Sequence, residues 1–307
     1  MQPLRAITFK IISVAVFVTM QSLIKATADS IPPGEAMFFR SFFALPIIVG
    51  WLALRRELAT GFRTQDPMGH VWRGIVGSTS MGLGFAALGY LPLPEVTALG
   101  YATPIFVVIF AAMFLNERIR LFRLGMVALG LVGVMVVVSP RLSVAASGVS
   151  TEQTLGAVLV LASAVAAAQA QVFIRKLTAT ETTSSIVFWF SITATLLSLI
   201  TLYWGWELPT PKQAILLVSA GLLGGVGQIL LTTSYRLGDA SLVAPFDYVS
   251  MIFAVTIGMV FFDEWPQKTT LIGAAIVISA GVMIILRERK LGLERASQRK
   301  AMAPGGK

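Results

Sequence analysis

The chain has 307 residues, of which 56% are hydrophobic and only 13% are charged, and its mean hydropathy is +0.80. This composition excludes an ordinary soluble domain and indicates that lipid is the main solvent. The formal net charge of +9 could suggest a nucleic-acid partner, but the basic residues lie in connections and in the tail rather than on one folded face. The chain has no Cys and a single His, which excludes disulfides, thiolate chemistry and most His-based metal sites, and we expect no cofactor.

Ten apolar segments have the length that a membrane-spanning helix requires, roughly 20 residues. In chain order we predict helices near residues 5–25, 34–54, 70–90, 95–115 and 121–139, then near 154–175, 185–205, 213–235, 240–262 and 268–286. Pro and Gly residues separate them, as in Ile31-Pro32-Pro33-Gly34 and Leu91-Pro92-Leu93-Pro94. The sequence therefore predicts an all-α integral membrane protein, with a basic and disordered cytoplasmic tail over 288–307.

The second five segments repeat the residue pattern of the first five. Asn116-Glu117 after the fourth segment matches Asp263-Glu264 after the ninth, and Gly133-Val134-Met135 reappears as Gly281-Val282-Met283. Because each unit holds an odd number of helices, the second unit must enter the membrane from the opposite side. We therefore predict two inverted five-helix repeats, 1–140 and 150–287, the arrangement that allows alternating access to a midplane site. Duplication kept for packing alone is the alternative.

The start of the chain admits a second interpretation. Arg5 and Lys10 precede an apolar run, and Ala26-Thr27-Ala28 resembles a signal-peptidase site. Against this, the segment has a counterpart in the second repeat, where 171–175 matches 21–25. With both termini in the cytoplasm, most Lys and Arg residues, Lys10 and Arg73 among them, count as cytoplasmic charges. Positively charged connections are retained there, so we predict this orientation and expect a bacterial inner-membrane location.

The order of several motifs resembles the drug/metabolite transporter superfamily, specifically its ten-helix EamA-type members, over about residues 5–287. The motifs are Glu35-Ala36-Met37-Phe38-Phe39-Arg40-Ser41-Phe42-Phe43, Pro104, Phe114-Leu115-Asn116-Glu117-Arg118-Ile119 and Phe261-Phe262-Asp263-Glu264. The resemblance implies secondary transport of small organic solutes such as amino acids, nucleosides, vitamins or S-adenosylmethionine. The Phe-Phe-Arg opening with His70-Val71-Trp72-Arg73-Gly74 is most similar to the branch of S-adenosylmethionine and riboflavin importers.

Two charged residues inside the predicted helices are candidates for solute binding, because a charge at the bilayer centre costs roughly 2.5 to 3.5 kcal/mol without a partner or a wet cavity. Asp247 could bind a cationic group, carry a proton or bond a neighbouring helix. Arg40 could contact an anionic or carbonyl group, pair with Glu35 or Glu95, or anchor the helix at the interface.

Polar and aromatic side chains complete the predicted site. Gln228 shares a helix face with small residues, and Gln171 repeats Gln21. The aromatic candidates for the cavity walls, which could also pack or face lipid, are Phe38, Phe39, Tyr101, Trp189, Phe190 and Tyr248. Pro104 and Pro245 lie within helices four and nine and are hinge candidates, since proline removes a backbone hydrogen bond.

These observations predict a secondary transporter that binds no nucleic acid and acts as a monomer or homodimer in the lipid bilayer. No ATP-binding motif occurs in the sequence. Transport is therefore driven by an ion gradient, with the proton as the candidate ion, or proceeds by facilitated diffusion. We expect uptake of an aromatic cofactor-type solute such as riboflavin, with S-adenosylmethionine uptake and amino-acid or toxic-amine efflux as alternatives. An integral-membrane enzyme acting on lipid phosphates is the alternative from another class.

Overall fold

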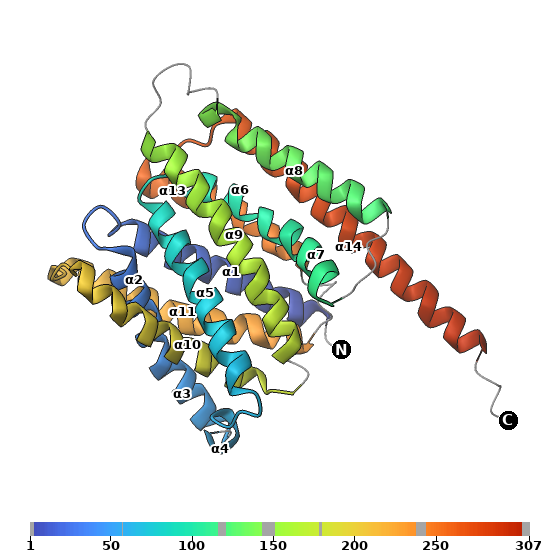
Figure 1. Cartoon of the computed structure of the whole chain (residues 1–307), viewed down its shortest axis with the longest axis horizontal. Coiled ribbons are helices and arrows are strands. Elements are labelled where there is room, and N and C mark those ends of the chain that lie inside the picture. Colours follow the sequence, from blue (N-terminus) through green and yellow to red (C-terminus); the bar gives the residue numbers. More distant parts are fainter. Residues whose placement is uncertain are drawn as a thin grey trace.

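The computed structural model describes residues 3–56, 58–115, 121–142, 151–177, 180–237 and 244–302. Over these residues the chain is helical and contains no strand, which confirms the predicted all-α class (Figure 1). The first half consists of α1 (Pro3–Lys25), α2 (Pro33–Phe42), α3 (Ala44–Leu54), the short α4 (Leu58–Gly61), α5 (Pro67–Leu88), α6 (Leu93–Gly100), α7 (Ala102–Leu115) and α8 (Leu121–Leu142). The second half consists of α9 (Thr151–Leu177), α10 (Thr183–Ile200) with η2 (Thr201–Trp204), α11 (Pro211–Leu237), η3 (Ala244–Val249), α13 (Ser250–Phe262) and α14 (Lys268–Met302).

Five of the described helices are long and apolar enough to cross a membrane: Leu4–Lys25, Pro33–Leu54, Thr151–Ile174, Ser184–Trp204 and Pro211–Ser234. Shorter apolar helices cover Leu124–Pro140, Phe246–Phe262 and Lys268–Ile284. Within the described residues, each of the ten predicted segments is helical, although three of them are interrupted.

The interruptions follow the prolines. The second segment is divided at Phe43, and Pro46 lies in the first turn of α3. The fourth segment is divided at Tyr101, and Pro104 lies in the first turn of α7. Proline lacks the N–H that would continue the preceding helix, so it is tolerated in the first turn of a new one. The ninth segment begins as the 3₁₀ helix η3, which contains Pro245. The breaks are consistent with the two proline hinges, whose movement stays a prediction.

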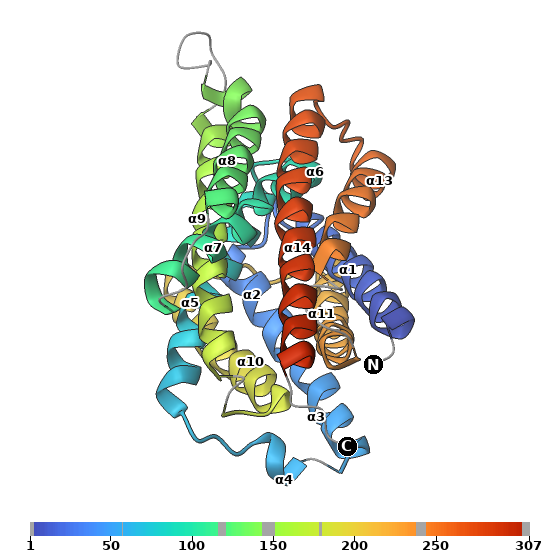
Figure 2. The same ribbon diagram turned by 90° about the vertical axis from the view of Figure 1, so that its right-hand side faces the viewer.

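The contacts between the halves repeat when the halves are exchanged. The first helix of one repeat packs along the third helix of the other, both as α1 with α11 and as α9 with α5 (Figure 2). The second helices α2 and α10 pack on each other, and so do the fifth helices α8 and α14. This pattern is that of an inverted repeat, and it confirms the fold predicted from the odd number of helices per unit.

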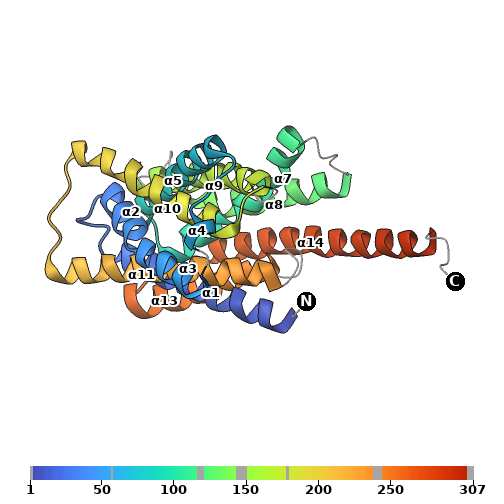
Figure 3. The ribbon, with the colours of Figure 1, turned by 90° about the horizontal axis from the view of Figure 1, so that it is seen from below.

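The pair of α8 and α14 lies along one side of the bundle. A Cβ added at Gly273 would lie 2.6 Å from the carbonyl oxygen of Gly133, and a Cβ at Gly133 would lie 2.9 Å from that of Gly273, so the two backbones meet there. Helix α14 continues to Met302 beyond the bundle (Figure 3), whereas the sequence predicts disorder after 287. Arg, Glu, Lys and Ala, which dominate this stretch, have high helix propensity and can extend a helix that is already formed.

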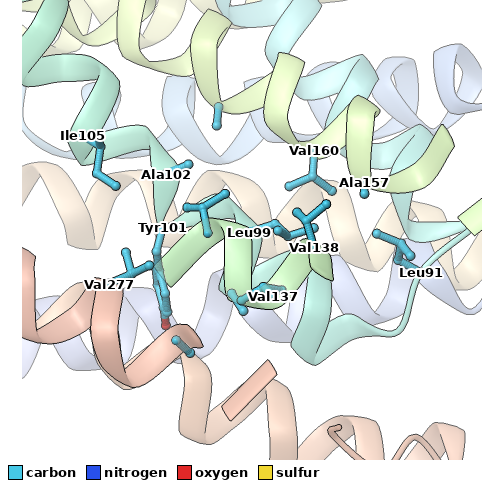
Figure 4. Close-up of a cluster of buried hydrophobic side chains, with 14 of the residues drawn as sticks. Leu91, Leu99, Tyr101, Ala102, Ile105, Val137, Val138, Ala157, Val160 and Val277 are labelled. Carbon is cyan, nitrogen blue, oxygen red and sulfur yellow. The ribbon is translucent and has the colours of Figure 1, made fainter. Parts of the chain in front are cut away.

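The largest buried cluster joins the two halves. It brings together apolar side chains of α6, α7, α8, α9 and α14, with Tyr101 and Val160 among them (Figure 4). A second cluster lies between α1, α2, α5 and α11, and Leu93 and Leu217 are fully buried in it. The cavity described next lies against both clusters.

Candidate functional site

A cavity of about 450 Å³ lies inside the bundle, between the two halves. Its walls come from α1, α5, α6 and α9, with single residues from α2, α7, α10, η3 and α13. The volume falls within the roughly 300–1,000 Å³ of small-molecule sites, and most of the wall is apolar with a few polar groups, as in such sites.

Two pairs of residues that correspond in the repeats meet at this cavity. Tyr101 and Tyr248 stand equally far before Asn116 and Asp263 in the chain, and their rings pack edge to face with centroids 5.1 Å apart. Arg40 and Phe190 correspond as well, and the Arg40 Cζ lies 5.7 Å from the Phe190 ring centroid. Corresponding residues can touch only where the pseudo-twofold axis passes between them. The cavity therefore lies on this axis, at the place that two exchanging halves share.

Arg40 lines the cavity, and its side chain is buried with 7% exposed. It forms no ion pair with Glu35 or Glu95, the partners considered from the sequence; Glu35 instead accepts a hydrogen bond from the backbone N–H of Glu207, 3.1 Å away. A Cβ added at Gly224 of α11 would lie 3.3 Å from Arg40 Nε, so the missing side chain makes room for the guanidinium.

Asp247 also lines the cavity, from η3, and half of its side chain (51%) is accessible there. Its Oδ1 lies 2.7 Å from Nζ of Lys10 in α1, and the Lys10 side chain is only 1% exposed. The sequence analysis counted Lys10 among the cytoplasmic charges, although the predicted helix 5–25 includes it. In the structure Lys10 is buried within α1. An ammonium buried so completely requires a nearby carboxylate, which explains why α1 and η3 are held together.

The other predicted site residues are distributed unevenly. Tyr101 lines the cavity and shares a hydrogen bond of 2.7 Å with Ser250 Oγ, while Tyr248 packs behind it. Phe39 stacks on Phe43 outside the wall, and Trp189 lies beside His70. The aromatic wall consists of Phe17, Phe85, Tyr101 and Phe190.

The two predicted glutamines do not line the cavity. Gln171 is exposed and Gln228 is half-buried, whereas Gln21 in α1 is a wall residue. Helix α9 contacts the cavity through Val160, Ser163 and Ala164, and Gln171 lies farther toward its C-terminal end. Of this repeat-related pair, the cavity wall includes Gln21 rather than Gln171. Pro104 is exposed on α7, away from the cavity.

The sequence interpretation also missed Arg73, which it counted as a cytoplasmic charge. Arg73 is buried in α5 with 8% exposed, and its Cζ lies 3.8 Å from the Phe190 ring centroid. Its position within a predicted helix, shortly before the small and hydroxyl residues of Ser78-Thr79-Ser80, is the signal that could have identified it.

The Lys25 cluster, which consists of Lys25, Leu88, Leu91, Leu93 and Glu264, lies next to the cavity, whose wall includes Leu88. The Lys25 ammonium lies 2.8 Å from Glu264 Oε1 and donates to the carbonyl oxygens of Leu88 and Leu91 at 3.1 and 2.8 Å. Glu264 Oε2 accepts from the Leu93 N–H at 2.8 Å. The cluster joins the end of α1, the connection between α5 and α6, and the end of α13, so it ties the two repeats together. Glu117, the counterpart of Glu264, lies outside the described residues.

At the opposite end of the bundle, the connection before α10 is joined to the connection before α5. Glu181 Oε1 accepts hydrogen bonds from Thr64 Oγ1 and from the Asp66 N–H at 2.8 and 2.9 Å, and from the Gln65 N–H. His70 Nε2 lies 3.7 Å away. Burial raises the pKa of Glu181, but these donors and His70 outweigh it, and the pKa lies below its ordinary value.

An inverted-repeat helical bundle with a cavity on its pseudo-twofold axis and ionic contacts at its ends defines a membrane transporter rather than an enzyme. The comparison with protein families agrees. Residues 4–139 and 154–287 each match the EamA-like transporter family, and the chain belongs to it.

Named relatives cover most of the chain. It is 30% identical to the pseudopaline exporter CntI of Pseudomonas aeruginosa over 87% of this chain and 91% of that one. It is 29% identical to the S-adenosylmethionine uptake transporter of Rickettsia bellii, over 83% of this chain and 84% of that one. It is 28% identical to the riboflavin transporter of Rhizobium johnstonii, over 84% of this chain and 83% of that one. A solved crystal structure matches the fold with a TM-score of 0.66 at 18% identity, covering 93% of this chain and 98% of that one.

Proposed function

We propose that this protein moves a small organic metabolite across the bacterial inner membrane by alternating access, through the cavity on the pseudo-twofold axis. The observation that carries the proposal is the meeting of the corresponding residues Tyr101 with Tyr248 and Arg40 with Phe190 at that cavity. If the two halves exchange conformations, the cavity stays on the axis while the closed end changes. The Pro104 and Pro245 breaks give α7 and η3 the freedom to move.

The orientation of the protein follows from the distribution of Lys and Arg. With both termini in the cytoplasm, the Lys25 cluster faces the outside and the Glu181 contacts face the cytoplasm. The Lys25 cluster, which is intact here, then closes the path to the outside. Uptake and export use the same two openings, and the relatives include transporters of both directions.

The aromatic wall supports a solute with a flat ring system. Phe17, Phe85, Tyr101 and Phe190 offer ring faces and edges to such a solute, and riboflavin and S-adenosylmethionine each contain one. Amino acids and amines fit the same volume. Proton coupling, if present, is expected at Asp247, the titratable carboxyl in the wall, with Lys10 compensating its charge.

The proposal is tested by filling the cavity. Gly100 lines the cavity, and a Cβ added there meets no atom within 4 Å, so Gly100→Leu places an isobutyl group in the space of the solute without a backbone clash. We expect flux of radiolabelled riboflavin, S-adenosylmethionine or amino acids into proteoliposomes to fall roughly tenfold or more. A solute that enters the partly filled cavity must overpack it, at a cost of about 1–3 kcal/mol.

The matched control is Gly50→Leu. Gly50 is exposed on α3, and an added Cβ there also meets nothing within 4 Å. Flux in this variant should equal that of the unmodified protein. If Gly100→Leu transports the solute as fast as Gly50→Leu, the cavity is not the transport path.

A further inference from the structure

Buried hydrogen-bond groups without a partner gather at one place in the described part of the chain, where α2, α5 and α10 meet. The buried polar side-chain atoms that lack a partner there belong to Arg40, Ser41, His70, Arg73, Ser78 and Trp189. The guanidinium, hydroxyl and indole N–H groups of the other five residues are hydrogen-bond donors, and the His70 imidazole can donate as well. Buried polar groups are normally paired, so a cluster of unpaired donors indicates that an acceptor binds there.

Two of these residues are permanent cations. The guanidinium groups of Arg40 and Arg73 both contact the ring of Phe190, with Cζ-to-centroid distances of 5.7 and 3.8 Å. Neither arginine forms an ion pair or hydrogen bond with any residue that the structure describes. Both side chains are more than nine-tenths buried. Two like charges in a medium of low dielectric repel each other, and the contact with one phenyl ring compensates only a part of the desolvation cost.

The negative groups near this place already have partners. Asp247, in the cavity wall, is paired with Lys10. Glu181 lies 3.7 Å from His70 but is bound by Thr64 and by backbone N–H groups. The region around Phe190 therefore holds positive charge that no described carboxylate neutralises.

The cavity gives access to both guanidinium groups. Arg40 and Phe190 are wall residues, and so is Gly77 of α5. A Cβ added at Gly77 would overlap Arg73 Nη1, so the guanidinium of Arg73 lies against the backbone at this wall position. A planar anion that enters the cavity at Gly77 can reach both arginines.

We propose that Arg40 and Arg73 form a receptor for a carboxylate group of the transported solute, with Phe190 between them as the wall. A guanidinium presents its N–H groups in a plane that matches the two oxygens of a carboxylate. This inference rests on the proposed function and narrows its solute to one that carries a carboxylate. S-adenosylmethionine and amino acids satisfy this condition, and riboflavin does not.

The test uses two probes of nearly identical shape, phenylacetate and its neutral amide, phenylacetamide. The full chain in lipid nanodiscs is heated with each probe, because a ligand that binds the folded protein raises its melting temperature. We expect phenylacetate to raise the melting temperature and phenylacetamide to leave it unchanged. Arg40→Gln and Arg73→Gln should each weaken phenylacetate binding about tenfold or more, and Arg40→Lys should retain part of it.

The control is Arg55→Gln, which changes an exposed arginine that contacts Trp51 at the end of α3 and should leave binding unchanged. A receptor role also predicts that Arg40→Gln does not lower the melting temperature without ligand. The substitution removes a desolvated charge and breaks no ion pair or hydrogen bond with a described residue. Equal shifts from the two probes, or binding that survives in both Gln variants, would overturn the inference. A larger shift from inorganic phosphate than from phenylacetate would overturn the assignment to a carboxylate.

The binding result is independent of transport. If phenylacetate binds through the arginines but no solute crosses proteoliposomes, the proposed function fails and the receptor stands. If a carboxylate solute crosses at the same rate in Arg40→Gln and Arg73→Gln, the receptor fails and the transport function stands.

Discussion

The Lys25 cluster offers a direct test of how the cavity is closed. Glu264 uses both carboxylate oxygens, one for Lys25 and one for the Leu93 N–H, and the side chains of Lys25 and Glu264 are only 11% and 16% exposed. Glu264→Gln removes the charge and keeps the shape. A hydrogen bond to a charged group contributes about 1.5–3 kcal/mol, so the equilibrium between the closed and open states should shift roughly tenfold to a hundredfold toward opening.

The absence of Cys from the chain makes this shift measurable, since a single introduced Cys can be labelled without background. Thr97 lines the cavity one turn inside Leu93, to whose carbonyl oxygen its hydroxyl donates. In a Thr97→Cys background, Glu264→Gln should accelerate labelling by a membrane-impermeant maleimide in intact cells. The increase should be absent from inside-out vesicles.

Glu152→Gln in the same background is the control, because Glu152 is an exposed glutamate near the start of α9. Labelling in this variant should match that of Thr97→Cys alone. If Glu264→Gln leaves the labelling rate unchanged on both sides of the membrane, the Lys25 cluster does not close the cavity. An increase confined to inside-out vesicles would instead reverse the proposed orientation.

Three further outcomes follow from the packing and the charges. Gly273→Leu should destabilise the protein by about 1–3 kcal/mol because the side chain meets the backbone of α8, whereas Gly125→Leu, with open space around it, should not. Thermal unfolding compares the two variants, and equal melting temperatures would contradict the close approach of α8 and α14. Asp247→Asn should lower the melting temperature by breaking the pair with buried Lys10, at a cost of about 3–5 kcal/mol. It should also abolish any dependence of uptake on the pH gradient. Unchanged stability would exclude the structural role of Asp247, and unchanged coupling would exclude its proton-carrying role. Because the pKa of Glu181 is lowered in the folded protein, its stabilising contribution is fully present above the ordinary pKa and is lost as pH falls through the folded pKa. Glu181→Gln should therefore flatten the acid side of a plot of melting temperature against pH, and an unchanged plot would exclude this contribution.

Part of the site could be predicted from single residues. Arg40 and Asp247 were identified because a charge inside an apolar helix requires a partner or a wet cavity, and Tyr101 was identified as an aromatic candidate for the wall. All three line the cavity. The same rule applied to Arg73 and Lys10 would have placed them in the protein interior. Both were instead counted as cytoplasmic charges because they lie near the predicted start of a helix.

Which of the other candidates line the cavity could not be predicted, because the direction in which a side chain points was not encoded locally. Phe39, Trp189 and Gln171 lie on the correct helices but outside the cavity, whereas Phe190, which was also a candidate, and Gln21 line it. In a soluble helix the apolar stripe marks the buried face. In this chain both lipid and the protein interior are apolar, so the periodicity of an apolar segment does not distinguish the face toward the cavity from the face toward lipid.

The sequence by itself determined the solvent, the ten spans, the turns between them and the inverted repeat, because each of these depends on composition, on proline and glycine or on the number of helices in a unit. The tertiary structure decided which side chains meet: Lys10 with Asp247, Lys25 with Glu264, and two arginines with Phe190. These contacts join the first helices of the chain to elements of the second repeat. Their geometry depends on how α1, α2 and α5 cross α10 and α13, and the crossing is fixed by the packing of whole helices rather than by any local pattern.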